Sequence, residues 1–236
     1  MINNIVDFLV GPFLVWLPSI FWWAVFAGAF LTYTSSYVPL RERFQKIILW
    51  FASRNYWTLI YIAIGFRVLY AVYISVAQYY VWKNGGDFTN MLASSPLPDA
   101  VPGTFFTNLF PGIFQSEFGY VTFYDLGRYG LNVLWSIAVA FMFWAFLRVL
   151  KKYNGRFFDT QETELGLLCA LIVGWPSLAI FVPLVFISVI VVSIIRGIFF
   201  KEAYTTLGYP FLLATLMCLL FGSQLIEMFG LGVLRI

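Results

Sequence analysis

Three acidic side chains, Asp159, Glu162 and Glu164, lie close together in the sequence, directly before a long apolar run. Neighbouring carboxylates can share a proton and activate water for hydrolysis, or they can bind a metal ion. Negative charge is also favourable at the N-terminus of a helix, because the helix dipole is positive there. The cluster therefore predicts either an N-terminal cap for the next helix or a degenerate or metal-binding acidic site.

The residue types available elsewhere restrict the chemistry further. The sequence contains no histidine, which is the usual general base and the usual nitrogen ligand of zinc and haem. Both cysteines, Cys169 and Cys218, lie inside apolar runs, where they are expected to pack as small apolar residues. Any reaction must depend on carboxylates, hydroxyls or amines, and we predict neither a metal nor a cofactor.

Two further charged residues, Arg67 and Glu227, lie inside apolar stretches. An ionisable side chain deep in a membrane is costly and usually faces a partner or a cavity. Arg67 is therefore a candidate functional residue, and the alternative is a structural pair with Glu227 in the interior of the helix bundle.

The elements that carry these residues are membrane helices. The chain has 236 residues, of which 61% are hydrophobic and 11% are charged, and its mean hydropathy is +0.86. Soluble domains carry about 25% charged residues. Several apolar runs reach the roughly 20 residues that a helix needs to cross a bilayer. The composition predicts an all-α polytopic bundle in contact with lipid.

We expect about six spans, one of which is short. The tripeptide Gly174-Trp175-Pro176 interrupts an apolar stretch too long for a single crossing, so it predicts a broken pair of helices. The expected ranges are 10–33, 57–80, 129–150, 163–174, 177–199 and 208–233.

Composition divides the chain into three segments. Residues 1–82 hold the first two spans and a basic segment at 41–54 that is expected to lie on the cytoplasmic membrane surface. Residues 83–127 form a connection rich in Pro, Gly and aromatic residues, which predicts an ordered extracytoplasmic cap. Residues 128–236 hold the remaining helices.

The distribution of Lys and Arg predicts the orientation. With the N-terminus outside, ten of the fourteen basic residues lie on the cytoplasmic side, and only Lys83, Arg128 and Arg235 lie outside. Cytoplasmic loops of membrane proteins carry such an excess. The basic residues thus indicate topology, and no nucleic-acid partner is predicted.

One quarter of the chain, 164–222, resembles the C-terminal part of the type IV prepilin peptidases, which are membrane aspartyl proteases. The resemblance rests on the order of Glu164, a Leu167-Leu168 helix, the Gly174-Trp175-Pro176 turn, an apolar helix, a basic loop and Gly208-Tyr209-Pro210-Phe211-Leu212. Glu164 stands where the family's G-x-G-D motif has its aspartate, and Gln161 and Thr163 stand where it has glycines.

The resemblance implies a cytoplasmic site of two proton-sharing aspartates, a pilin-like or other single-span substrate, and a bacterial inner membrane. In this chain the first carboxylate is Glu164, with Asp159 as the other candidate near it. The family's second aspartate, expected at the cytoplasmic end of an earlier helix, is not identifiable. We expect Glu164 to be stabilised as an anion by Lys152 and Arg156. The sequence therefore predicts a catalytically degenerate relative that binds a membrane-proximal protein segment. A non-catalytic scaffold or assembly factor and a small transporter remain alternatives.

Overall fold

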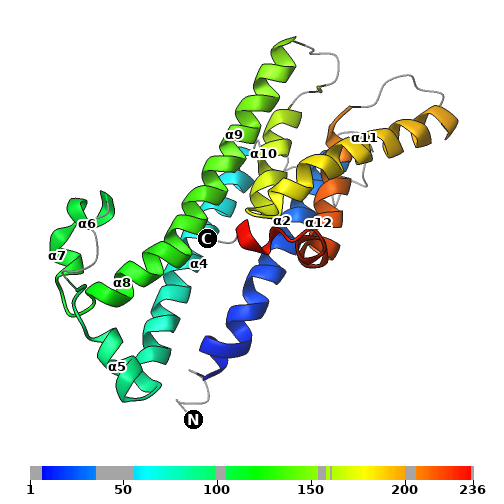
Figure 1. The fold of residues 1–236 in the computed structure, drawn as a ribbon. Helices are drawn as coiled ribbons and strands as arrows, with labels where there is room; N and C mark the ends of the chain where they lie inside the picture. Colours follow the sequence, from blue (N-terminus) through cyan, green and yellow to red (C-terminus); the bar gives the residue numbers. More distant parts are fainter. Residues whose placement is uncertain are drawn as a thin grey trace. The chain divides into compact units, whose positions relative to one another are not determined.

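The computed structural model describes residues 7–35, 56–98, 105–153, 158–159, 161–199 and 206–234. All regular elements in these ranges are helical, which confirms the predicted all-α class (Figure 1). The basic segment predicted on the membrane surface, 41–54, lies outside the described residues. In chain order the helices are η1 (Leu9–Phe13), α2 (Leu14–Ser35), α4 (Trp57–Asn84), α5 (Asp87–Ala93), α6 (Phe105–Leu109), α7 (Pro111–Phe114), α8 (Gly119–Asp125), η2 (Leu126–Gly130), α9 (Leu131–Tyr153), α10 (Glu162–Val173), α11 (Leu178–Phe199), α12 (Gly208–Met228) and η4 (Leu231–Leu234).

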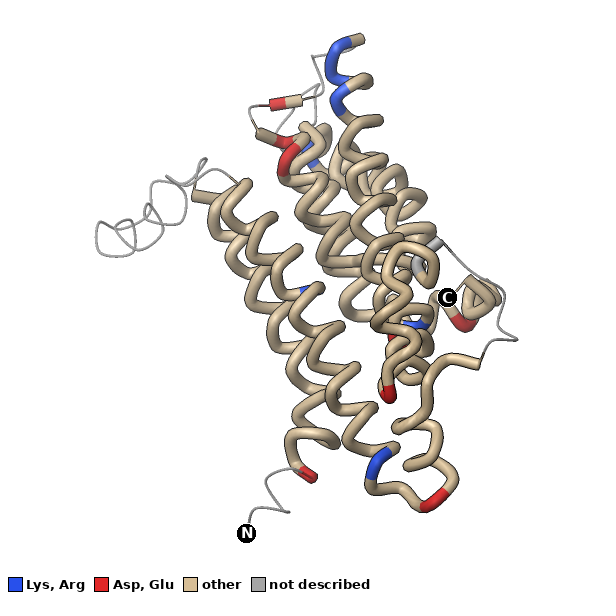
Figure 2. Tube along the Cα trace, turned by 90° about the vertical axis from the view of Figure 1, so that its left-hand side faces the viewer, with Lys and Arg blue, Asp and Glu red and all other residues tan. Residues whose placement is uncertain are grey.

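Five helical stretches in the described part are long and apolar enough to cross a membrane. The chain is therefore a multi-pass integral membrane protein. Charged residues lie mostly near helix ends, and the long helical stretches between them are largely uncharged (Figure 2). The spans are Leu9–Ser35, Trp57–Asn84, Gly119–Tyr153, Leu178–Ile198 and Gly208–Met228.

The short fourth helix of the six predicted, α10, has the expected position and only 12 residues. At 1.5 Å per residue it is about 18 Å long, which is shorter than the roughly 30 Å of a hydrocarbon core. It ends at Gly174, whose φ of 67° is readily adopted by glycine.

Two predicted boundaries are wrong. The third span begins at Gly119, ten residues earlier than expected, because α8, η2 and α9 run on as one helical stretch. The last helix, α12, ends at Met228 and not at 233, because Gly230 turns the chain with a φ of 65° before η4.

The chain forms two compact units, and each is described separately. Unit 1 contains residues 1–18 and 67–134, and unit 2 contains 19–66 and 135–235. The three segments predicted from composition were defined differently, by the membrane spans and the extracytoplasmic cap. That division stays a prediction.

In unit 1 the first span is tied to α4 through backbone carbonyls. Pro18 has no N–H group, so the carbonyl of Leu14, four residues earlier, lacks its usual helical donor. The hydroxyl of Tyr70 donates to this carbonyl at 2.7 Å, and the hydroxyl of Tyr73 donates to the carbonyl of Leu9 at 2.5 Å. These contacts supply the hydrogen bonds that a proline-interrupted helix needs inside a membrane.

The predicted cap consists of short helices joined by tight turns. The backbone of Leu97 donates to the carbonyl of Phe114, and the backbone of Tyr120 donates to the carbonyl of Ser95. The rings of Trp82 and Tyr124 lie 4.9 Å apart and join α8 to the end of α4. Backbone pairing and aromatic contacts therefore order this segment.

Unit 2 is built around α10, which is buried along almost its whole length. Leu165, Leu167, Leu168 and Leu171 have no exposed surface, because a helix that is apolar on all sides needs neighbours on all sides. Phe181 of α11 and Phe211 of α12 complete this core, also without exposed surface.

Candidate functional site at the start of helices α10 and α12

Five helix ends meet at one end of unit 2. Polar and cation–π contacts join the C-terminal ends of α2, α9 and α11 to the N-terminal ends of α10 and α12. Consecutive helices in this unit therefore alternate in direction as predicted, and α10 takes part in the alternation despite its length.

Glu162 lies at the centre of this end. It is the first residue of α10, and its side chain is 1% exposed. Its carboxylate accepts hydrogen bonds from the Tyr33 hydroxyl at 2.8 Å and from the backbone N–H groups of Gly208, Leu207 and Asp159 at 2.8, 3.2 and 3.0 Å. Backbone N–H groups can only donate, so this arrangement suits a carboxylate that acts solely as an acceptor.

The acidic cluster places two carboxylates, Glu162 and Glu164, in the first turn of α10, where negative charge was expected, although the N-cap residue Gln161 makes no side-chain capping hydrogen bond. Glu162 also caps a second helix. It accepts from Leu207 and Gly208, whose N–H groups at the start of α12 have no partner within their own helix. Because Glu162 leaves α10 toward α12, its charge acts on the dipole of α12.

Gly208 allows Tyr33 to reach Glu162. A Cβ atom at position 208 would lie 2.0 Å from Cζ and 2.1 Å from the hydroxyl oxygen of Tyr33. Only glycine therefore permits the tyrosine to stand against the first turn of α12. The ring of Tyr33 also packs edge-on against Tyr209, with centroids 5.0 Å apart, and its hydroxyl lies 3.3 Å from the Thr206 hydroxyl.

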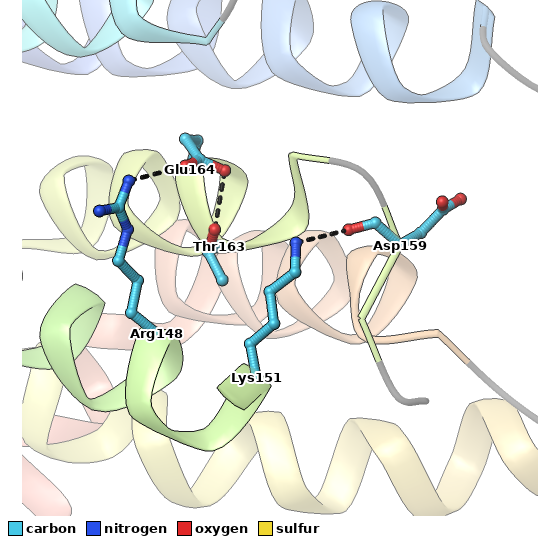
Figure 3. Close-up of polar contacts among 5 residues, drawn as sticks. All are labelled: Arg148, Lys151, Asp159, Thr163 and Glu164. Carbon is cyan, nitrogen blue, oxygen red and sulfur yellow. Dashed lines mark hydrogen bonds and ion pairs between the residues drawn. The ribbon is translucent and has the colours of Figure 1, made fainter. Parts of the chain in front are cut away.

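Glu164, the candidate catalytic carboxylate, faces a different neighbour. One of its oxygens lies 3.6 Å from the guanidinium of Arg148 in α9, and the other accepts a hydrogen bond from Thr163 at 2.7 Å (Figure 3). The Arg148 guanidinium also lies 4.0 Å above the ring of Trp144. The ion-pair partner seen is thus Arg148, whereas Lys152 and Arg156 were expected; Arg156 lies outside the described residues.

Asp159, the second candidate, is not oriented toward Glu164. Its side chain is exposed and its carboxylate points away from Glu164 in Figure 3, while its backbone carbonyl accepts from Lys151 at 3.4 Å. Of the three acidic residues, therefore, one caps α12, one pairs with α9 and one faces outward.

The backbone before α10 has an uncommon conformation. Gln161 has a φ of 68°, a left-handed value that glycine adopts readily and other residues adopt at a cost. This is the position at which the prepilin peptidase motif has its first glycine.

The two charges predicted inside the membrane differ in exposure. Arg67 is partly buried in α4. Glu227 lies one residue before the end of α12 and is exposed, so the expectation that it faces the bundle interior is wrong. The last helix, α12, ends at Met228 and not at the predicted 233, which places this residue near a helix end. Their pairing stays a prediction.

Sequence reasoning named Glu162, and it named Gly208 within the resemblance motif, but it missed their roles at this site and missed Tyr33. A usable signal was present, because Tyr33 closes the first apolar run and Gly208 opens the last one. Both were therefore expected at the same side of the membrane.

The described residues contain no group of three or more His, Cys, Asp or Glu side chains that could hold a metal ion. Comparison with known protein families, curated proteins and solved structures finds no match for this chain.

Proposed function

We propose that this membrane protein is a catalytically degenerate relative of the prepilin peptidases that binds the membrane-proximal segment of a pilin-like protein. The observation that carries the proposal is that both acidic groups in the first turn of α10 already have partners: Glu162 accepts from four donors, and Glu164 contacts Arg148 and Thr163. An aspartyl protease needs two carboxylates that share a proton across a water molecule. Here the carboxylates face different helices and serve structural contacts.

Two features support the relationship itself. The short buried helix, the Gly174 turn and the Pro210-Phe211 start of the last helix come in the family's order. The left-handed φ of Gln161 also falls where the family has glycine. In a degenerate relative, we expect the left-handed backbone conformation to persist at this position after the glycine has been replaced.

The proposal predicts binding without cleavage. In proteoliposomes that contain the protein and a pilin precursor, we expect the precursor to remain intact. A photo-crosslinking residue at exposed Lys152 should capture the precursor, whereas the same residue at exposed Asp87 should not. The measurement is gel mobility of both chains after illumination.

Two outcomes contradict this proposal in different ways. Specific cleavage that disappears in Glu164→Gln, in a variant that still inserts and folds, would restore the peptidase reading. Equal capture at Lys152 and Asp87, or none, would remove the pilin-binding role.

A scaffold is the second candidate, and exposed apolar side chains in the cap favour it. Phe88, Met91, Phe110, Ile113 and Phe118 are each between 48% and 69% exposed. Apolar patches of this kind are typical of partner or membrane contacts. Capture of a partner at Asp87 alone would favour this function.

We further propose that the protein resides in a bacterial inner membrane, as the resemblance implies, with its N-terminus outside, as the distribution of its basic residues favours. Single-cysteine variants at Asp87 and Lys152 should react with an impermeant maleimide from opposite faces of intact spheroplasts. Cys169 and Cys218 are buried and can be replaced by alanine for this purpose. Labelling of both positions from the same face would contradict the predicted topology.

A further inference from the structure

An apolar pocket lies in unit 2, at the opposite end of α12 from the contact between Glu162 and Gly208. Its volume is about 500 Å³, and all of the residues that line it are apolar. The first half of α11 forms one wall, the end of α12 forms the second, and Leu231 of η4 belongs to the third. The pocket is therefore a separate feature from the acidic site.

Two compact side chains on α11 help to create the hollow. Ala179 and Pro183 are four residues apart, so they lie on the same face of the helix, one turn from each other. Both line the pocket, and neither extends as far from the helix axis as Leu184, which lines it beside them. A leucine or phenylalanine in their place would fill the space between α11 and α12.

The wall formed by η4 is held in place by hydrogen bonds. Gly230 turns the chain after α12 with a φ of 65°, and Leu231 then lies in the same pocket as Ala179. The indole N–H of Trp175 donates to the carbonyl of Leu234, the last residue of η4, at 2.8 Å. The backbone N–H of Trp175 donates to the hydroxyl of Ser136 in α9 at 3.2 Å. The pocket is thus already formed before anything enters it.

The surroundings of the pocket indicate what occupies it. The part of the lining contributed by α11 lies within a membrane span, and α12 is the neighbouring span. Ile187 and Phe229 line the pocket and are 55% and 61% exposed, so it opens on the surface that contacts lipid. An apolar lining offers water no hydrogen bonds, and an empty cavity costs stability because its walls lose packing contacts. Hydrocarbon from the bilayer satisfies both conditions.

We propose that this pocket binds one acyl chain of a membrane phospholipid. Pockets for small molecules have volumes of about 300–1,000 Å³ and mostly apolar linings, so both its size and its chemistry fit. A lipid beside an exposed position such as Ile190 packs against one side of a helix, whereas an acyl chain in the pocket contacts α11, α12 and η4. Packing contacts in a membrane add up over many atoms, so this lipid should exchange more slowly than its neighbours. The proposal does not depend on pilin binding.

The test uses a phospholipid with a diazirine at the end of one acyl chain, mixed at low fraction into nanodiscs that contain the full-length protein. After illumination, peptide mapping should place most of the label on the pocket-lining residues of α11 and η4. Native mass spectrometry after mild detergent extraction should show one phospholipid retained per protein chain.

A pair of tryptophan variants in α11 separates the pocket from the general lipid contact. Leu184→Trp fills the pocket and should lower labelling there by about tenfold, because overpacking of a hollow weakens binding by about that factor. Ile190→Trp is the matched control, since Ile190 is 61% exposed and lies one turn beyond the lining residues, so labelling of the pocket should stay unchanged.

Three results would overturn the site. Uniform labelling of all lipid-exposed helix faces, with no phospholipid retained, would show that the pocket holds only freely exchanging lipid. A dimer whose protein chains crosslink through α11 and η4 would show that a second copy covers it. Equal loss of label in folded Leu184→Trp and Ile190→Trp would also contradict it. If Leu184→Trp does not insert and fold, the mapped label and the retained lipid of the wild type decide the question.

Discussion

Replacing Glu162 by alanine is expected to lower the free energy of unfolding by about 3–5 kcal/mol. The substitution removes the acceptor for the Tyr33 hydroxyl and for the N–H groups of Asp159, Leu207 and Gly208. A buried donor left without a partner costs about 1–3 kcal/mol, and partial entry of water recovers some of the sum. Equilibrium unfolding in mixed micelles, followed by circular dichroism, measures the change.

Glu164→Gln is the matched control for this prediction. It removes a carboxylate two residues away on the same helix, but the partner Arg148 is 56% exposed. Exposed ion pairs contribute about 0–1 kcal/mol, so the loss should not exceed this range. A Glu162→Ala variant as stable as Glu164→Gln would show that the four hydrogen bonds do not hold α12 in place.

Gly208→Ala is expected to cost about 2–5 kcal/mol, which is unusual for the addition of one methyl group to a helix. Its Cβ atom would lie 2.0 Å from Cζ of Tyr33, a residue that is only 4% exposed. The ring would have to move, and its hydrogen bond to Glu162 would be lost. The same unfolding measurement reports the effect.

A double-mutant cycle separates this steric cause from a general loss of helix stability. In a Tyr33→Ala background the space next to position 208 is open, so Gly208→Ala should cost at least 2 kcal/mol less there than in the wild type, by the same overpacking estimate. Gly197→Ala is the control, because a Cβ atom at that position meets nothing within 4 Å. Additive effects of the two substitutions at 208 and 33 would rule out the contact.

The amino-acid sequence determined the fold class and most of the helices. Long apolar runs must form helices in a membrane, where every backbone polar group needs an internal partner. The break at Gly174 was also predictable, because the apolar stretch is too long for one crossing and a proline follows. The sequence did not predict that the third membrane helix begins in α8 and continues through η2, because the Gly and aromatic residues of these elements were assigned to the cap.

The site depended on information that local sequence does not carry. Three acidic residues before a helix predict a cap, and charge at a helix start is favourable whichever residue provides it. The direction of each side chain decides which carboxylate contacts which helix. Glu162 leaves the first turn of α10 toward α2 and α12, whereas Glu164 leaves it toward α9.

Sequence alone therefore determined that this protein is a bundle of membrane helices with an acidic group at the start of its short helix. Only the tertiary structure decided that Tyr33, Glu162 and Gly208 form one contact, because they are separated by 129 and 46 positions along the chain. The periodicity of apolar residues and the bias of charges describe only a few turns of helix at a time. A hydrogen bond between distant residues exists only where packing brings the helix ends within about 3 Å of each other.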